Sequence, residues 1–500
     1  MKSMRKPFEI FFVLLTLGIL LHPKRREILS KIRNRAEDLA DQSWAIWLMS
    51  GIYFLLYMWQ QVTKYLALEI NFIPYLFFDY MLWYFEQGKL CYTGLLHGFY
   101  HANLIMLSLF PIWKLFHSSW VLHIAHPLLT VLAVIPLYYW SRDQLKDSFL
   151  ALIVAFVYLN FRYLQNLLLV NFVVEVFYPL LILSAIYFAS KKNEWLYYSS
   201  LILGLLTKED SAIYFGALGA FFLFLRGHRK RGLYTMALSF AYLVFVLRIF
   251  MPWSGSDILE GDLQNYPALG PSPAGIFRNI LKNPWLLIKE LFVPFEKVRT
   301  FFKLASKLIF LPVLSPWFIL VIASIYPLYF QGGDYFIQLA FHYTAAVLPF
   351  LFIAFADGWK RFLDSSFSRK IPSLKWITVT LLIFLNGMNL RPLHFTRDDL
   401  KTIALVKSLP PASIVVTQGH LLPYLGYKKY NFYISSQYEG RTDTREAYLK
   451  PDYYLFDFEA NAYPLNPEDL RAKADALKKN PIWKIVYLDH RRLLLQRITR

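Results

Sequence analysis

The sequence is poor in the residues on which many soluble and secreted proteins depend. It has 500 residues but a single cysteine, Cys91, so no disulfide bond can form within the chain. It contains no Asn-x-Ser/Thr glycosylation sequon and no cluster of cysteines and histidines with the spacing of a metal site. Only 17% of its residues are charged, against about a quarter in soluble domains. These absences exclude a disulfide-stabilised fold and argue against an ordinary soluble one.

Apolar sequence fills the chain instead. Hydrophobic residues make up 56% of it and aromatic residues 18%. They come in runs of about 15 to 22 residues, separated by short charged stretches. A helix rises about 1.5 Å per residue, so such runs are long enough to cross a hydrocarbon core about 30 Å thick. The pattern predicts a polytopic, mostly α-helical membrane protein.

The net charge of +19 does not indicate a nucleic-acid-binding surface. Its lysines and arginines lie in short loops between apolar runs, of which Arg226, Arg229, Lys230 and Arg231 form one. An excess of basic residues in short loops marks the cytoplasmic side of a membrane protein. We therefore expect membrane lipid as a partner and no nucleic acid.

The apolar runs divide the chain into three parts. Residues 1–43 hold a short apolar stretch (8–22), which either spans the membrane or lies at its interface, and a basic amphipathic segment (24–35). Residues 44–390 form the transmembrane part, with about eleven spans that begin inside, which places residues 391–500 outside. In chain order the predicted segments are 44–63, an outer segment 64–118, 119–140, 148–166, 174–190, two arms of a hairpin in 195–225, 233–250, an outer segment 251–300 with an amphipathic helix near 276–293, 301–315, 316–330, 341–357 and 376–390.

The hairpin is too short for two full spans. Basic residues flank 195–225 on both sides, so both of its ends are expected in the cytoplasm. Each arm then has about 13 to 15 residues, or roughly 20 to 22 Å, which is less than the bilayer core. Its tip, Thr207-Lys208-Glu209-Asp210, therefore lies below the outer surface. Charged residues at that depth are costly unless they are paired or face a wet cavity.

The last part of the chain, 391–500, has a different character. Charged residues become common, and short strand-like runs appear at 413–417, 453–458 and 483–489, with helical patterns at 398–408 and 467–479. Alternating strands and helices predict a small α/β domain, and about 110 residues suffice for a core of its own. We expect this domain to support binding of an acceptor or a partner.

Several polar motifs follow one another in a set order. They are Phe78-Asp79 and Trp83, His101, Glu175, LLTKEDSA (205–212), GPSPAGIFRNILKNP (270–284), His342-Tyr343, LPPASIVVTQGHLLPYL (409–425) and PDYYLFDF (451–458). This ordered set, over roughly residues 44–500, resembles an uncharacterised prokaryotic family of predicted multi-spanning membrane proteins, a domain of unknown function. That family is in turn similar to GT-C glycosyltransferases. The resemblance implies a GT-C-like fold in the cytoplasmic (inner) membrane of a prokaryote, with an extracytoplasmic C-terminal domain.

The resemblance also implies an activity, the transfer of a sugar from a polyprenyl-phosphate donor at the outer face of the membrane. Such chemistry needs a carboxylate to take the acceptor's proton, cations to bind phosphate and aromatic faces for the sugar or the lipid. We expect Asp79 and Glu175 to be catalytic. The residues expected to bind substrate or phosphate are His101, Lys208, Glu209, Asp210, His342 and Tyr343. No metal ligand is assigned, and a divalent cation as cofactor is left open.

Two positions depart from the family pattern. The family has an acidic residue five positions before the one that matches Asp79, where this chain has Pro74. It also has His-Pro before the glutamate of the fourth span, where this chain has Val173-Val174. In GT-C enzymes the early acidic residue is the expected base. Here Glu69 or Asp79 would have to take that role, or the site has lost catalysis.

Each candidate also has a purely structural explanation. Asp79 could cap an interfacial helix, and Glu175 could pair with Arg162. The 208–210 group could form a salt bridge that satisfies only itself. His342-Tyr343 could anchor a helix at the membrane interface, a level that tyrosine favours.

The histidines have structural explanations as well. His97 and His101 are one helical turn apart, as metal ligands can be, but an interfacial histidine is the simpler interpretation. His123 and His126 have apolar neighbours and precede a proline, so we expect them to pack within the helices.

Two other functions stay open. A transporter or flippase of a lipid-linked saccharide would show inverted repeats and polar groups near the middle of several helices. The sequence has no internal repeat, and its ionisable groups lie toward the predicted outer side. A non-catalytic membrane assembly or binding protein would keep the fold without the early acidic residue, which agrees with Pro74.

Overall fold

The structure is a computed structural model that describes residues 43–70, 72–88, 101–254, 273–331, 333–387, 390, 392–410, 413–425, 431–433, 451–462 and 465–498. Three predictions lie outside these residues: the apolar stretch 8–22, the basic segment 24–35 and His97. The first three residues of the GPSPAG sequence, 270–272, lie outside them too.

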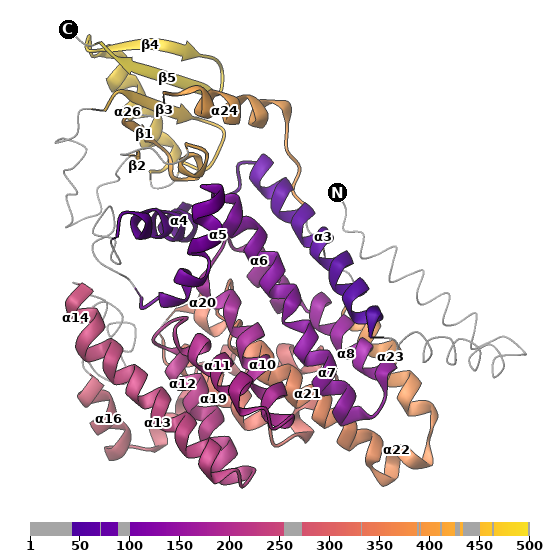
Figure 1. The fold of residues 1–500 in the computed structure, drawn as a ribbon. Helices are drawn as coiled ribbons and strands as arrows, with labels where there is room; N and C mark the ends of the chain where they lie inside the picture. Colours follow the sequence, from indigo (N-terminus) through magenta and orange to yellow (C-terminus); the bar gives the residue numbers. More distant parts are fainter. Residues whose placement is uncertain are drawn as a thin grey trace, which may run out of the picture.

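The larger part of the structure is helical (Figure 1). Apolar surroundings favour helices because a helix satisfies its backbone hydrogen bonds within one segment. Its first half consists of α3 (Trp44–Leu66), α4 (Phe72–Glu86), η1 (Leu104–Ser108), α5 (Phe110–Phe116), α6 (Trp120–Leu132), α7 (Val134–Leu145), α8 (Ser148–Asn160), α9 (Arg162–Leu169), η2 (Val174–Val176), α10 (Phe177–Ser190), α11 (Glu194–Leu205), α12 (Ser211–Ala220), η3 (Phe221–Leu225), α13 (Arg229–Phe245), η4 (Val246–Phe250) and α14 (Met251–Ser254). Its second half consists of α16 (Pro273–Lys282), α17 (Trp285–Phe292), α18 (Phe295–Ser306), η5 (Leu311–Leu314), α19 (Phe318–Tyr329), α20 (Asp334–Ile337), α21 (Val347–Asp364), α22 (Ser366–Lys370) and α23 (Ser373–Leu385).

The second half corrects two predictions. The amphipathic helix expected near 276–293 is two helices, α16 and α17, because Pro284 lacks the backbone N–H that a continuous helix needs. The span expected at 301–315 is wrong. There α18 ends at Ser306, Ile309 and Phe310 adopt positive φ angles, and a single 3-10 turn follows.

Helix α21 runs through the core. Every residue from Val347 to Trp359 is buried, as expected for a helix that is apolar on most sides. Gly358 allows the η5 turn to pack against it, since a Cβ at this position would lie 1.9 Å from the carbonyl oxygen of Leu311. The break in the 301–315 segment is therefore part of how the core closes.

Two of the described helices are long and apolar enough to cross a membrane, Trp120–Leu145 and Arg229–Ser254. The bent pair Ser148–Asn160 and Arg162–Leu169, with an angle of 43° at the break, would make a third. Other apolar helices are shorter, among them Val174–Ser190 and Ser211–Leu225. The count of about eleven spans therefore stays a prediction.

Helices α11 and α12 form the helical hairpin predicted for 195–225. α11 has 12 residues, α12 with the π-helix η3 has 15, and the turn between them holds the Lys208-Glu209-Asp210 sequence. α11 packs mainly on α10, and α12 packs mainly on α13. The two arms are thus fixed by different neighbours, and the turn joins them at one end of the helical part.

The C-terminal part holds a five-stranded sheet of order β2-β1-β3-β5-β4. Strand β1 is parallel to β2 and β3, whereas β5 is antiparallel to β3 and β4. The elements are α24 (Arg397–Ser408), β1 (Val415–Thr417), the 3-10 helix η6 (Gly419–Tyr424), β2 (Asn431–Tyr433), β3 (Tyr453–Asp457), α26 (Pro467–Lys479), β4 (Trp483–Leu488) and β5 (Arg492–Arg497). The segments predicted as strands coincide with β1, β3 and β4, and the predicted helices coincide with α24 and α26.

The sheet lies at one end of the helical part, next to α4 and α24 (Figure 1). Its η6 segment packs on α4, and the Tyr424 hydroxyl donates a hydrogen bond of 2.5 Å to the Tyr65 carbonyl at the end of α3. Nearby, the Leu393 N–H donates to Thr63 Oγ1 at 3.2 Å. The ends of α3 and α4 are therefore tied to the C-terminal part.

Candidate functional site

Four segments that are distant in sequence bring ionisable side chains together. They are the stretch just before η1, the η2 turn before α10, the turn between α11 and α12, and the turn before α21. Their ionisable members form what we call the polar cluster: His101, Glu175, Lys208, Glu209, Asp210 and His342. All of these residues lie outside the long helices, at positions where helices begin or end.

Glu175 faces a lysine and a histidine. Lys208 Nζ lies 3.1 Å from Glu175 Oε1, and His342 Nε2 lies 3.7 Å from the same oxygen. Only 11% of the Glu175 side chain and 14% of the Lys208 side chain are exposed. The alternative that Glu175 pairs with Arg162 is wrong, because the Arg162 side chain is exposed and the ion-pair partners of Glu175 are Lys208 and His342.

Glu209 pairs with His101. Its Oε1 lies 2.6 Å from His101 Nδ1, and its Oε2 accepts the Ala102 N–H at 3.1 Å. Within η1, the Ile105 N–H donates a hydrogen bond of 2.8 Å to the Leu206 carbonyl. The start of η1 is thus fastened to the α11–α12 turn by both side-chain and backbone bonds.

Asp210 is held by two tyrosines that the sequence analysis did not single out. The Tyr178 hydroxyl donates to Asp210 Oδ1, and the Tyr214 hydroxyl donates to Oδ2 at 3.2 Å. Tyr214 is four residues after Asp210 on the same helical face, a spacing that could have revealed it. Nothing in the sequence indicated Tyr178, because α10 and the turn meet only through folding. The 208–210 group therefore does not satisfy itself, since each of its charges finds a partner on another segment.

The histidines are the most accessible members of the polar cluster. Their side chains are 27% exposed at His101 and 22% exposed at His342. His342 Nδ1 is buried and has no hydrogen-bond partner among the described residues, and its ring lies 4.3 Å from the Tyr343 ring. The Tyr343 ring in turn lies 4.5 Å from Phe336. The predicted His342-Tyr343 pair thus combines an imidazole near Glu175 with an aromatic face.

Asp79 lies on a separate element, α4, and is 6% exposed. Its Oδ1 accepts a hydrogen bond of 3.3 Å from the Trp113 indole on α5. That bond helps to orient the carboxylate. Pro74 is also part of α4, so the position that departs from the family pattern lies one turn before Asp79 in the same helix.

A cavity of about 220 Å³ is lined by residues that neighbour the polar cluster in sequence, although no side chain of the cluster lines it. Phe341, the neighbour of His342, and Asn171, four residues before Glu175, line it. So do Lys64 and Glu69, at the end of α3. The residue considered as an alternative base, Glu69, therefore faces an open volume, and its side chain is exposed.

No metal centre is assembled by the part of the chain that the structure describes. Within it, no group of three or more histidine, cysteine, aspartate or glutamate residues could hold a metal ion. His123 and His126 are buried on α6, in agreement with a role in packing.

Three comparisons place the chain among known proteins. A family model described as "Predicted membrane protein (DUF2079)" matches residues 74–487. Crystal structures of ArnT from Cupriavidus metallidurans align with a TM-score of 0.42, one in the apo state at 14% identity and one bound to undecaprenyl phosphate at 12% identity. The first alignment covers 90% of this chain and 98% of ArnT, and the second covers 91% and 99%. No curated protein matches the sequence.

Proposed function

The chain belongs to the DUF2079 family of predicted membrane proteins, and we propose that it transfers a sugar from a polyprenyl-phosphate carrier to an acceptor at the outer face of the prokaryotic inner membrane. One observation carries this proposal. Four separate segments bring three carboxylates, a lysine and two partly exposed histidines together at one end of the helices. Buried charge is costly, so charge that is gathered from four segments and can be reached through exposed histidines supports a function that needs it.

Phosphate binding is the role we assign to Lys208 and His342. Both face Glu175, which holds them in place. A phosphate oxygen entering the same space would accept hydrogen bonds from the Lys208 ammonium and from the imidazole, and such charge-assisted bonds are strong. As the phosphate leaves the sugar it gains negative charge, and these donors would stabilise it.

Proton transfer is the role we assign to His101. Glu209 binds Nδ1 of its ring, which orients the imidazole and leaves Nε2 for a substrate hydroxyl. In the proposed step the acceptor oxygen attacks the anomeric carbon of the sugar. The bond from that carbon to the phosphate oxygen breaks, and the hydroxyl proton passes to His101 Nε2. Asp79 and Glu175, the residues expected to be catalytic from the sequence, are the alternative proton acceptors.

The cavity supports the same proposal. Its wall combines the apolar Phe341 and Leu169 with the polar Lys64 and Glu69, a mixture suited to a sugar attached to a lipid phosphate. Its volume of about 220 Å³ leaves room for a sugar ring but not for the whole carrier lipid. The isoprenoid chain would then lie outside, against the apolar helices.

A second function, non-catalytic binding of a lipid-linked saccharide, is favoured by one specific observation. Lys208 and Glu209 are already matched with partners inside the protein, so the charges form a closed arrangement without substrate. Under this alternative the protein would bind undecaprenyl phosphate but would release none from a sugar-loaded donor. A transporter or flippase would move the loaded donor between leaflets with its sugar still attached.

The experiment that tests the proposal measures release of undecaprenyl phosphate from undecaprenyl-phosphate-linked hexoses and pentoses by the purified full-length protein, in the presence of a cell-envelope extract that supplies the acceptor hydroxyl. We expect Lys208→Ala and His101→Ala each to lower the rate by about 100-fold or more, because the first removes a donor to the leaving phosphate and the second removes the general base. Lys191→Ala is the matched control, since Lys191 forms an exposed ion pair with Asp143 at 2.6 Å. Wild-type rates in both correctly inserted site variants would refute the proposal.

A further inference from the structure

A second pocket lies at the opposite end of the helices that carry the polar cluster. Glu175 directly precedes α10, whereas Ala189 and Ser190 at its other end line this pocket. α10 has 14 residues, so the two sites are about 20 Å apart along its axis. The same holds for α12, which begins after Asp210 and continues through η3 to Phe222, another lining residue.

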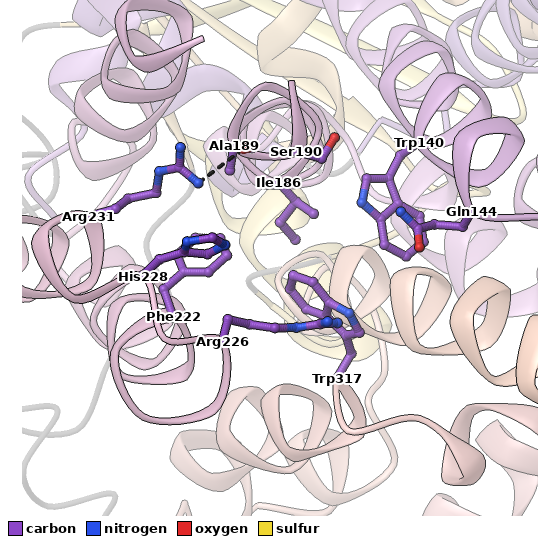
Figure 2. A pocket seen from close by; sticks show the side chains of 10 residues that line it. All are labelled: Trp140, Gln144, Ile186, Ala189, Ser190, Phe222, Arg226, His228, Arg231 and Trp317. Atoms are coloured by element: carbon purple, nitrogen blue, oxygen red, sulfur yellow. Dashed lines mark hydrogen bonds between the residues drawn. The ribbon is translucent and has the colours of Figure 1, made fainter. Parts of the chain in front are cut away.

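The pocket has aromatic walls and a basic rim (Figure 2). Its volume is about 130 Å³, several times the roughly 30 Å³ that one water molecule occupies in the liquid. Trp140 and Trp317 are buried in its wall, at 2% and 4% exposure. The remaining side chains that matter here are Gln144, Ser190, Phe222, Arg226, His228 and Arg231.

The two arginines differ in what they already bind. Arg231 donates to the Ala189 carbonyl at 3.0 Å and pairs with Glu194, so its charge is matched. The Arg226 guanidinium instead lies over the Trp317 ring, 4.9 Å from its centroid. Within the described part of the chain, no carboxylate lies within ion-pair distance of Arg226.

The nearest acidic group is engaged elsewhere. Asp357 accepts hydrogen bonds from Arg361 Nε at 2.8 Å and from Ser315 Oγ at 2.6 Å. A second unused donor is close by, because Trp317 Nε1 is buried and has no hydrogen-bond partner among the described residues. A guanidinium on an aromatic face together with an unused indole N–H calls for a ligand that accepts hydrogen bonds and carries negative charge.

The predicted position of the pocket at the cytoplasmic side of the membrane agrees with a phosphate group as its ligand. The residues on its rim come from the basic 226–231 loop, which the positive-inside rule assigns to the cytoplasmic side. Basic pockets between helices at that level suit the phosphate headgroups of anionic lipids. We propose that this pocket binds a phosphate group at the cytoplasmic surface, held by Arg226 with His228, Gln144 and the Trp317 indole. The site is independent of the sugar transfer proposed above.

Two sources share this chemistry, an anionic phospholipid headgroup and soluble phosphate. The test uses the purified full-length protein in neutral detergent and measures binding of phosphatidylglycerol by native mass spectrometry, with phosphatidylcholine as the reference lipid. Arg226→Ala is expected to raise the dissociation constant for phosphatidylglycerol about tenfold, as loss of a charged hydrogen-bond donor does. Arg229→Ala is the matched control. It removes a neighbouring exposed arginine that does not line the pocket, and it should change binding less than twofold.

Equal losses in Arg226→Ala and Arg229→Ala would overturn the proposal, because they would show general surface attraction, and so would no loss in either. A competition arm separates the two sources. Displacement of phosphatidylglycerol by millimolar inorganic phosphate, absent in Arg226→Ala, shows that the pocket accepts free phosphate, and a lack of displacement assigns it to the lipid headgroup. Gln144→Glu is a second test that does not depend on correct folding of Arg226→Ala. It adds a carboxylate to the rim and should weaken binding to a similar degree.

Discussion

Two networks of buried charge can be compared in this protein, one in the C-terminal sheet and one at the end of the helices. In the sheet, Arg491 Nε lies 2.8 Å from Asp457 Oδ1, and Arg491 Nη1 lies 2.8 Å from Asp399 Oδ1. Asp457 is completely buried, and Arg491 is 7% exposed. The polar cluster has ion pairs of similar length, but its histidines are 22% and 27% exposed.

The comparison shows that buried ion pairs do not by themselves mark a functional site. The Asp457 carboxylate also accepts backbone N–H groups from Glu459 and Ala460, and Asp399 belongs to the capping box of α24. The network therefore fixes α24 on the sheet, and its charged groups are almost completely buried. The polar cluster differs because its two histidines are partly exposed, whereas Arg491 and Asp457 are almost completely buried. Access from outside distinguishes the two.

The largest effect is expected when the sheet network is broken. Arg491→Met leaves Asp457 buried without its cation, which should cost about 3 to 5 kcal/mol of the free energy of unfolding. Thermal and denaturant unfolding of the full chain in detergent measures this loss. The double variant Arg491→Met/Asp457→Leu removes both charges and should recover part of it. A single-variant loss below about 1 kcal/mol would contradict the structural role.

A smaller loss of stability is expected at the polar cluster. Lys208→Met leaves Glu175 with only His342, but the partly exposed site can admit water, so the loss should be about 2 to 3 kcal/mol. Lys191→Met breaks an exposed pair and should cost less than about 1 kcal/mol in the same unfolding assay. If the rate of sugar transfer by Lys208→Met falls only as far as its smaller folded fraction explains, Lys208 has a purely structural role like that of Arg491. The proposed difference between the two networks would then be wrong.

The pH dependence of stability offers a third test, through His420 in η6. Burial lowers the pKa of His420 to about 4, with Asp457 opposing this shift and Arg491 adding to it. Because the folded state holds the neutral ring, the contribution of His420 to the free energy of unfolding is fully present above pH about 6.5. It is lost as the pH drops toward about 4. At pH about 5 the loss should be about 2 kcal/mol. His420→Phe should remove this part of the pH dependence of the free energy of unfolding, and it should leave the pH dependence above pH about 7 unchanged. Identical slopes in both proteins would contradict the buried neutral state.

The smallest effect is expected at Asp79. Asp79→Asn keeps an oxygen that can accept the Trp113 N–H, so the free energy of unfolding should change by about 1 kcal/mol or less. If His101 is the proton acceptor, the rate of sugar transfer should also stay within a few-fold of wild type. A loss of transfer as large as that of His101→Ala, without loss of stability, would move the role of base to Asp79.

Part of the candidate site was predictable because its motifs lie at helix ends. The spacing of basic residues around 195–225 placed Lys208, Glu209 and Asp210 in a turn, and the structure has that turn. The partners were not predictable. His101 and Glu209 are separated by 108 positions in the chain, and Lys208 and Glu175 by 33, so no local periodicity links them. Asp79 was grouped with these residues by order along the chain, yet it accepts a hydrogen bond from Trp113 on α5, which the sequence did not indicate.

By itself the sequence determined the helical class, the α/β character of the C-terminal part and the charged turn, because these depend on apolar runs, strand-like alternation and flanking basic residues. The tertiary structure alone decided which charges meet. It broke the 301–315 segment so that η5 could pack on Gly358 of α21. It also brought Lys208 and His342 to Glu175 while leaving Arg226 over an indole ring. The physical reason is that desolvation makes each buried charge depend on partners that only long-range packing supplies.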